Sequence, residues 1–196
     1  VTDEGSVRAL CEDARRHLGA VDIVVNNAGV SASSPLYRIT LGEWNRVLAV
    51  NATGTFLSTR EFVPAMVERK WGRVINIASL AGLEGARYVA HYSAAKHAVV
   101  GLTRSVALEL AGSGVTVNAI CPAYVDSPMT EITLANVQTR AGLPREGALA
   151  AVLATTGQER LITPEEVAAA VLDLCRDEAA AVSGQTIVLG AGGHTP

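Results

Sequence analysis

Short and almost continuously apolar segments alternate with helical segments along the chain, and this alternation limits the folds that the sequence can adopt. Apolar or β-branched runs predict strands at residues 21–25, 73–78, 115–121 and 185–189. Strands this apolar are buried on both faces, which requires a helix between each pair. The sequence therefore predicts an α/β fold with a doubly wound parallel sheet.

Helix start and stop signals lie between these strands. Thr40 with Glu43, and Thr163 with Glu166, have the spacing of a capping box, in which each residue's side chain binds the other's backbone. Gly19 is a typical helix end. The predicted helices cover residues 6–18, 40–67, 91–111 and 163–176.

Residues 123–162 differ from the rest of the chain. They contain Pro128, Pro144 and short Ala/Leu-rich pieces of helical character, but no strand pattern. We expect this segment to form a helical lid over the substrate, within a single domain that covers residues 1–196.

Composition excludes several classes of partner. The chain has 196 residues, 49% of them hydrophobic, and a net charge of -3, which suits one buried core. It offers no basic stripe for nucleic acid and no apolar run of about 20 residues for a membrane. Its cysteines are odd in number and far apart, so we expect reduced thiols, a cytoplasmic location and no metal site. They are Cys11, Cys121 and Cys175.

Lysine is scarce, which draws attention to the two positions that keep it. Fourteen of the sixteen basic residues are Arg, and only Lys70 and Lys96 are Lys. Tyr92 lies four residues before Lys96, so both side chains project from one face of a predicted helix. An ammonium group lowers the pKa of a nearby phenol, which makes the pair a candidate general acid and base. The pattern alone also fits a solvated helix face.

Three further residues are candidates because of their positions. Ser79 follows the strand at 73–78, where ligands bind in parallel sheets, although a helix cap or turn is the ordinary role of serine. Asn51 lies inside a long apolar helix that disfavours it, either for a functional reason or as a harmless exposed residue. His91 could line a substrate pocket or be a partly exposed residue at a helix start.

Six short segments along the chain form a pattern together. They are NNAG at 26–29, VNATGTF at 50–56, RVINIAS at 73–79, YSAAK at 92–96, VTVNAICPAYVDSPM at 115–129 and GQTIVLGAGG at 184–193. In this order they resemble the short-chain dehydrogenase/reductase family over essentially the whole chain. Ser79 precedes Tyr92 by thirteen positions, the interval usual in that family. The resemblance implies a Rossmann-type sheet.

The resemblance implies an oxidoreductase that interconverts a carbonyl and a secondary alcohol with NAD or NADP. Tyr92 would move the proton, Ser79 would hold the substrate oxygen, and Lys96 would lower the pKa of Tyr92 and bind the nicotinamide ribose. Asn51 would hold a water molecule that connects Lys96 to solvent. The implied cofactor contacts are Asn26, Ala28, Gly29, Tyr92, Lys96, Pro122, Val125 and Ser127.

One part of the family pattern has no counterpart. The glycine-rich T-G-x-x-x-G-x-G turn that receives the pyrophosphate is missing, so we expect the N-terminal strands and the residues that choose between NAD and NADP to be absent from this chain. A sheet that starts at residues 21–25 would expose an apolar edge. A non-catalytic fragment that lacks the cofactor-binding half is therefore an alternative hypothesis.

The substrate is expected to be a small molecule. The segment around Tyr92 looks most like 3-oxoacyl thioester and polyketide ketoreductases, and 3-hydroxybutyrate-type or other secondary-alcohol dehydrogenases are the alternative. We also expect a homotetramer, because the predicted helix after Tyr92 carries small residues that the family usually buries between subunits. They are Ala94, Ala95, Ala98 and Gly101.

Overall fold

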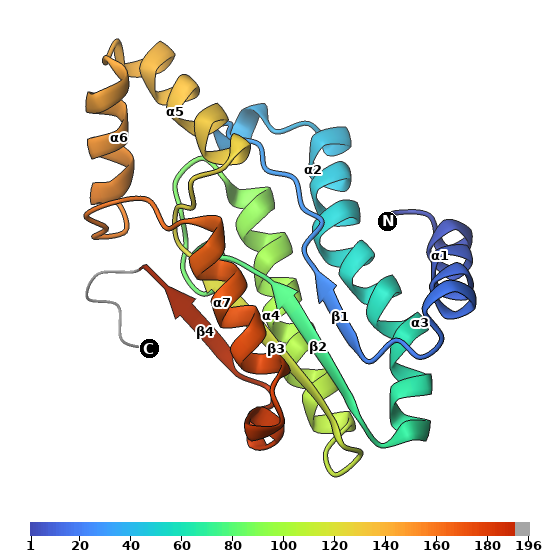
Figure 1. Cartoon of the computed structure of the whole chain (residues 1–196). Coiled ribbons are helices and arrows are strands. Elements are labelled where there is room, and N and C mark those ends of the chain that lie inside the picture. Colours follow the sequence, from blue (N-terminus) through green and yellow to red (C-terminus); the bar gives the residue numbers. More distant parts are fainter. Residues whose placement is uncertain (191–196) are drawn as a thin grey trace.

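Four parallel strands form one sheet in the order β1-β2-β3-β4, as Figure 1 shows. The computed structural model describes residues 1–190, so the last three residues of the predicted GQTIVLGAGG motif lie outside the described residues. The predicted α/β fold with a parallel sheet is confirmed. The strands are β1 (Ile23–Asn26), β2 (Gly72–Ile77), β3 (Val115–Pro122) and β4 (Thr186–Leu189).

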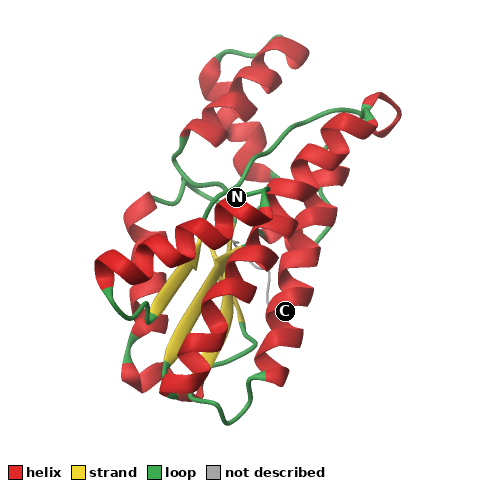
Figure 2. Ribbon diagram, turned by 90° about the vertical axis from the view of Figure 1, so that its right-hand side faces the viewer, coloured by secondary structure: helices red, strands yellow, loops and turns green. Residues whose placement is uncertain are grey.

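Helices cover both faces of the sheet. Because successive residues of a strand point to opposite sides, each strand contributes side chains to both faces. Val74 of β2 packs in one core with residues of α3 (Gly54–Arg69) and α4 (Ala90–Glu109). Its neighbour Ile75 packs on the other side against Leu174 of α7 (Pro164–Cys175). The two helical layers are visible on either side of the strands in Figure 2.

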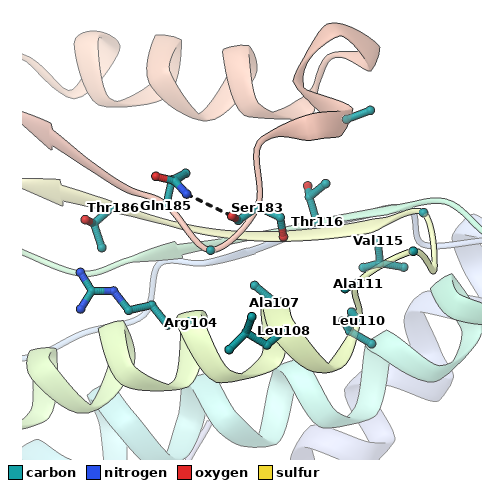
Figure 3. Close-up of a pocket in the computed structure, with 14 residues that line it drawn as sticks. Arg104, Ala107, Leu108, Leu110, Ala111, Val115, Thr116, Ser183, Gln185 and Thr186 are labelled. Atoms are coloured by element: carbon teal, nitrogen blue, oxygen red, sulfur yellow. Dashed lines mark hydrogen bonds between the residues drawn. The ribbon is translucent and has the colours of Figure 1, made fainter.

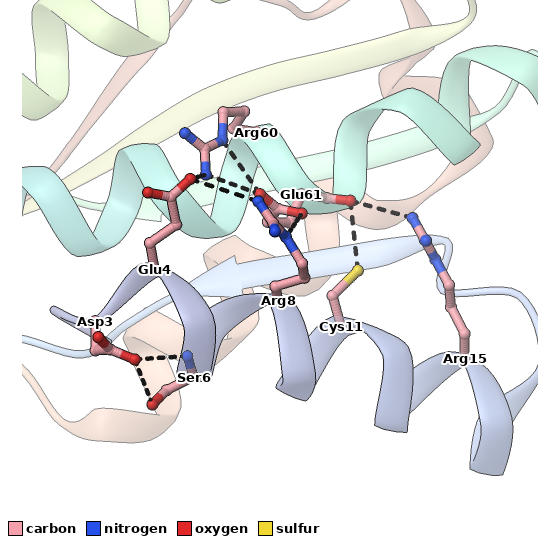
Figure 4. A network of polar contacts seen from close by, with 8 residues as sticks. All are labelled: Asp3, Glu4, Ser6, Arg8, Cys11, Arg15, Arg60 and Glu61. Carbon is pink, nitrogen blue, oxygen red and sulfur yellow. Dashed lines mark hydrogen bonds and ion pairs between the residues drawn. The ribbon is translucent and has the colours of Figure 1, made fainter.

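Helix α1 (Glu4–Leu18) lies outside α3 and packs on it through apolar side chains. Polar contacts between the two helices are shown in Figure 4. Val7 and Cys11 are its buried residues, and the Cys11 thiol donates to the backbone oxygen of Glu61. Arg60 of α3 pairs with Glu4 at 2.7 Å and with Glu61 at 2.8 Å. Because these charges are partly exposed, the buried side chains contribute more of the attachment.

The long helix predicted from Thr40 is interrupted at Asn51. It consists of α2 (Leu41–Leu48), a π-helical turn (Ala49–Thr53) and α3. The Thr40 hydroxyl accepts the backbone N–H of Glu43 at 3.1 Å, as predicted. The Glu43 carboxylate turns to His91 of α4 instead of completing the capping box. The second predicted box, at the start of α7, is complete.

Residues 123–162 contain two helices and no strand, as predicted. Helices α5 (Pro128–Ala141) and α6 (Arg145–Ala154) pack against each other beyond the carboxyl ends of the strands (Figure 1). The segment begins and ends at one point, where Val125 pairs with Ile162 in a single parallel bridge. Short helical turns complete the described chain at Leu36–Arg38, Leu80–Gly82 and Asp177–Ala181.

Strand β1 forms one edge of the sheet and leaves apolar side chains in solvent. Ile23 is 43% exposed and Val25 is 42% exposed. They lie on the same side of the sheet as α7, which packs on β2 and β3. The expected apolar edge is therefore present.

No helix among residues 1–190 combines the length and the apolar character that crossing a membrane requires.

Candidate active site

The carboxyl ends of the strands bring most of the predicted catalytic residues together. Ser79 lies two residues after the end of β2. Tyr92 and Lys96 lie in the first two turns of α4, which packs against β3 and the turn after Ser79. Asn51 lies in the π-helical turn, which also contacts α4. Residues from three separate segments thus meet at the edge of the sheet where ligands of this fold bind.

Lys96 is the most buried charged group of this cluster, with 5% of its surface exposed. Its ammonium donates a hydrogen bond of 2.7 Å to the backbone oxygen of Ile77 and lies 5.6 Å from the centre of the Tyr92 ring. Burial lowers the pKa of Lys96 to about 8 because the surrounding protein solvates the charge poorly. The ammonium is thus placed to donate hydrogen bonds to a ligand bound beside Tyr92.

Tyr92 differs from expectation in the direction of its pKa. Burial raises the pKa of the Tyr92 phenol, the Ser79 hydroxyl opposes this, and the Lys96 ammonium is not among the groups that shift it. Loss of solvent therefore dominates the pKa of this phenol, and the role predicted for Lys96 in lowering it stays a prediction. Ser79 also caps the turn that follows it by accepting the backbone N–H of Ala81 at 3.2 Å. Its two alternative roles, ligand-facing residue and cap, are compatible.

Asn51 is buried and fully engaged, so the exposed alternative is wrong. Its amide donates to the backbone oxygens of Val30 and Val47, each at 2.8 Å, and accepts the Val30 N–H at 3.3 Å. A side chain on Gly29 would come within 2.9 Å of the Asn51 oxygen and 3.7 Å of the Lys96 nitrogen. The distance to Asn51 is too short for a side chain, so a glycine suits the loop where it passes this amide. π-Helical turns are frequent at functional sites for such reasons.

The residues predicted to hold the adenosine side of the cofactor lie at the end of β1. The Asn26 amide donates to Asn76 at 2.8 Å and to Thr59 at 3.1 Å, so this side chain braces β1 against β2 and α3. Ala28 is exposed in the following loop, beside Gly29. Their roles toward the cofactor stay predictions.

The residues predicted to surround the nicotinamide occupy the turn after β3. Pro122 ends that strand, and Ser127 caps α5 by accepting the backbone N–H of Thr130 at 3.4 Å. The backbone oxygen of Val125 accepts the Thr130 hydroxyl. The turn is therefore held by its own hydrogen bonds, and its contacts with the cofactor stay predictions.

Sequence reasoning missed Tyr124 and Gln158. The Tyr124 phenol lies close enough to Tyr92 to contribute to its raised pKa. Gln158, which is buried, accepts the backbone N–H of Tyr124 at 2.9 Å and donates to its oxygen at 3.0 Å. Tyr124 could have been predicted from its position in the turn after β3, where ligands bind. Gln158 lies 34 residues further along the chain, and no local pattern indicates its contact with Tyr124.

Comparison with known proteins identifies the family. The family model described as Enoyl-(Acyl carrier protein) reductase matches residues 1–194. A D-beta-hydroxybutyrate dehydrogenase of Rhizobium meliloti is 40% identical over 176 residues, which are 89% of this chain and 68% of that protein. The chain belongs to the short-chain dehydrogenase/reductase family. It is an NAD(P)-dependent oxidoreductase, as the resemblance of its motifs implied.

Other members of the short-chain dehydrogenase/reductase family agree with this assignment. The putative ketoacyl reductase 1 of the granaticin polyketide synthase of Streptomyces violaceoruber is 40% identical over 95% of this chain and 70% of its own length. The 3-oxoacyl-acyl-carrier-protein reductase FabG of Escherichia coli is 36% identical over 98% of this chain and 74% of its own length. A variant actinorhodin polyketide ketoreductase, crystallised with NADPH, superposes with a TM-score of 0.93 and 36% identity over 97% of this chain and 74% of that one.

The buried lysine fits a dinucleotide cofactor of this family. An ammonium group has three N–H donors, and among the described residues Lys96 donates one hydrogen bond, to Ile77. The remaining donors suit the paired hydroxyls of a nicotinamide ribose beside Tyr92.

The lowered pKa of Lys96 predicts a stability that depends on pH. Between pH 8 and 10.5 the unfolded chain keeps the lysine proton that the folded chain has released, so the free energy of unfolding rises with pH. Lys96→Met removes the titrating group, so we expect the wild type to gain stability relative to this variant as the pH rises, by at most about 1.4 kcal/mol per pH unit. Urea unfolding without cofactor measures it, and a difference that stays constant over this range would contradict the burial argument.

Proposed function

We propose that this enzyme reduces the ketone of a 3-oxoacyl thioester, or of a similar small substrate, to a secondary alcohol with NADH or NADPH. The observation that carries the proposal is the convergence of Ser79, Tyr92 and Lys96 at one edge of the sheet. The similarity to a granaticin ketoacyl reductase and to FabG supports the substrate class.

The site suits protonation of a carbonyl oxygen. Because burial raises the pKa of Tyr92, the phenol stays protonated at neutral pH and can donate its proton as the ketone is reduced. Ser79 provides a hydroxyl that can share the same oxygen, and Lys96 orients the ribose of the cofactor. The bound dinucleotide supplies the hydride. Asn51 holds the loop at Gly29 in place beside Lys96.

Arginine pairing in the region of residues 123–162 favours a thioester over a free acid. Arg145 pairs with Glu131, and Arg160 makes two hydrogen bonds of 2.8 Å to Glu166. Arg140 donates to the backbone oxygen of Ser33 at 3.0 Å. Since a free carboxylate needs a cation and two of these three arginines are already paired with carboxylates, a substrate with a neutral acyl group fits better beneath the proposed lid. A 3-hydroxybutyrate-type dehydrogenase remains the second candidate, supported by the Rhizobium relative.

Replacement of the proposed proton donor tests the mechanism. Tyr92→Phe keeps the ring but removes the hydroxyl, so we expect turnover to fall by about 10²- to 10⁴-fold while cofactor affinity changes little. NAD(P)H oxidation and fluorescence titration of both cofactors measure the two quantities in the full-length protein. Full activity in Tyr92→Phe contradicts this mechanism. The polypeptide of residues 1–196 tests the alternative of a non-catalytic fragment, which is supported if this polypeptide neither binds nor oxidises NAD(P)H.

Substrate comparison separates the two candidate activities. We expect acetoacetyl thioester to be reduced with a kcat/KM at least about tenfold above that of free acetoacetate, because two of the three arginines of the lid are already paired with carboxylates. Steady-state kinetics with the same enzyme preparation provide the comparison. The reverse order would favour the 3-hydroxybutyrate-type activity.

We also propose that the enzyme assembles as a homotetramer in the cytoplasm. The free thiols Cys11, Cys121 and Cys175 suit a reducing compartment. Three of the four small residues singled out on α4 are exposed, and Ala95 is the exception because it packs within the subunit. Beside this face a groove of about 830 Å³ runs between α4 and the edge of the sheet near Thr186 (Figure 3).

Assembly can be tested with a charge on the exposed face of α4. Ala98→Glu would place a carboxylate there without disturbing the catalytic face of the helix, so we expect it to dissociate the tetramer. Light scattering gives the mass of both proteins. A wild type that is monomeric at micromolar concentration contradicts the proposal.

A further inference from the structure

His91, which immediately precedes the proposed proton donor, is buried beside an acidic residue of another helix. Its side chain is 0% exposed, so the expectation of a partly exposed histidine is wrong. The Glu43 carboxylate of α2 lies 3.8 Å from its Nε2 atom. This contact joins the helix that carries Tyr92 to the helix that leads into the π-helical turn with Asn51.

The contact between His91 and Glu43 is incomplete. Neither ring nitrogen of His91 has a hydrogen-bond partner among the described residues. A buried polar group without a partner costs about 1 to 3 kcal/mol, so its presence calls for an explanation. An approach of about 1 Å between α2 and α4 would turn the 3.8 Å separation into a charge-assisted hydrogen bond. Hydrogen bonds at active sites often tighten in this way when substrate binds.

The first turn of α4 has no side-chain cap of its own. Its N-cap residue, Val89, offers no side-chain hydrogen bond, unlike the N-cap residues of α2 and α7. The preceding Tyr88 has a φ of 66°, a left-handed conformation that a bulky residue adopts only under constraint. The Ser93 hydroxyl, in the same turn, is also buried without a partner among the described residues. The turn that presents Tyr92 therefore depends on contacts from neighbouring elements.

We propose that His91 is a positioning residue: with Glu43 it fixes the first turn of α4, and thereby the Tyr92 phenol, against the helix that carries Asn51. Glu43 is available for this because its carboxylate does not complete the capping box of α2, while its backbone N–H stays capped by Thr40. The inference rests on the proposed reductase function, since the phenol is positioned for proton transfer.

Variants at both positions test the inference in the full-length protein. We expect His91→Leu and Glu43→Gln each to lower kcat at least about tenfold, with KM and cofactor affinity changed less than about threefold. His91→Gln, which can still donate to Glu43, should retain more activity than His91→Leu. The double variant should be no slower than His91→Leu alone, because both changes break one contact.

Two further measurements separate positioning from a general loss of structure. The melting temperature of His91→Leu should stay within about 2 °C of the wild type, since leucine removes two unpaired polar atoms from the interior. Hydrogen exchange in a peptide covering residues 88–96 should become faster in that variant, with or without substrate. Glu109→Gln is the matched control for Glu43→Gln, because it makes the same charge change at the far end of α4. It should alter none of these quantities.

The possible failures have different meanings. Unchanged exchange at residues 88–96 in His91→Leu overturns the inference whether or not the wild type is active. So does a kcat within twofold of an active wild type, or a melting temperature that falls in step with activity. An inactive wild type in which His91→Leu still accelerates exchange contradicts the proposed function and leaves the positioning of this turn supported.

Discussion

Burial of the Lys96 ammonium is the constraint around which the site is built. A charge held this far from water needs a fixed partner, and the carbonyl of Ile77 at the end of β2 provides it. That hydrogen bond joins α4 to the central part of the sheet, so the strand that carries Ser79 and the helix that carries Tyr92 keep a constant relation. The same burial keeps the Tyr92 phenol protonated. One desolvated corner therefore sets both the geometry and the protonation states that proton donation to a ketone requires.

The π-helical turn contacts α4 and contributes Asn51 to the same site. Its extra residue directs Asn51 away from the helix path and into the backbone of the loop after β1. Gly29 in that loop lies close to both Asn51 and Lys96. Through Asn51 the π-helical turn joins the loop after β1 to the end of α2.

Sequence reasoning predicted the strands, the principal helices and the proximity of Ser79, Tyr92 and Lys96, because these depend on local patterns such as apolar runs, cap residues and residue spacing. It failed where a property depends on distant groups. The pKa of Tyr92 follows from burial, which the charge of Lys96 alone did not reveal. Glu43 satisfied the local rule for a capping box, but His91, 48 residues later, draws its carboxylate away. Tertiary contacts override local preference in both cases.

The bridge between Val125 and Ile162 has a consequence for how such an enzyme can diversify. The hydrogen bonds from Asp126 to Ile162 and from Ile162 to Tyr124, at 2.8 and 3.0 Å, bring the two ends of the α5 and α6 segment to the same place. A segment closed at its base can change in length or composition with little effect on the strands beneath it. Selection can therefore replace this segment as a unit and alter the range of acceptable substrates, while the proton-transfer residues stay where the sheet holds them.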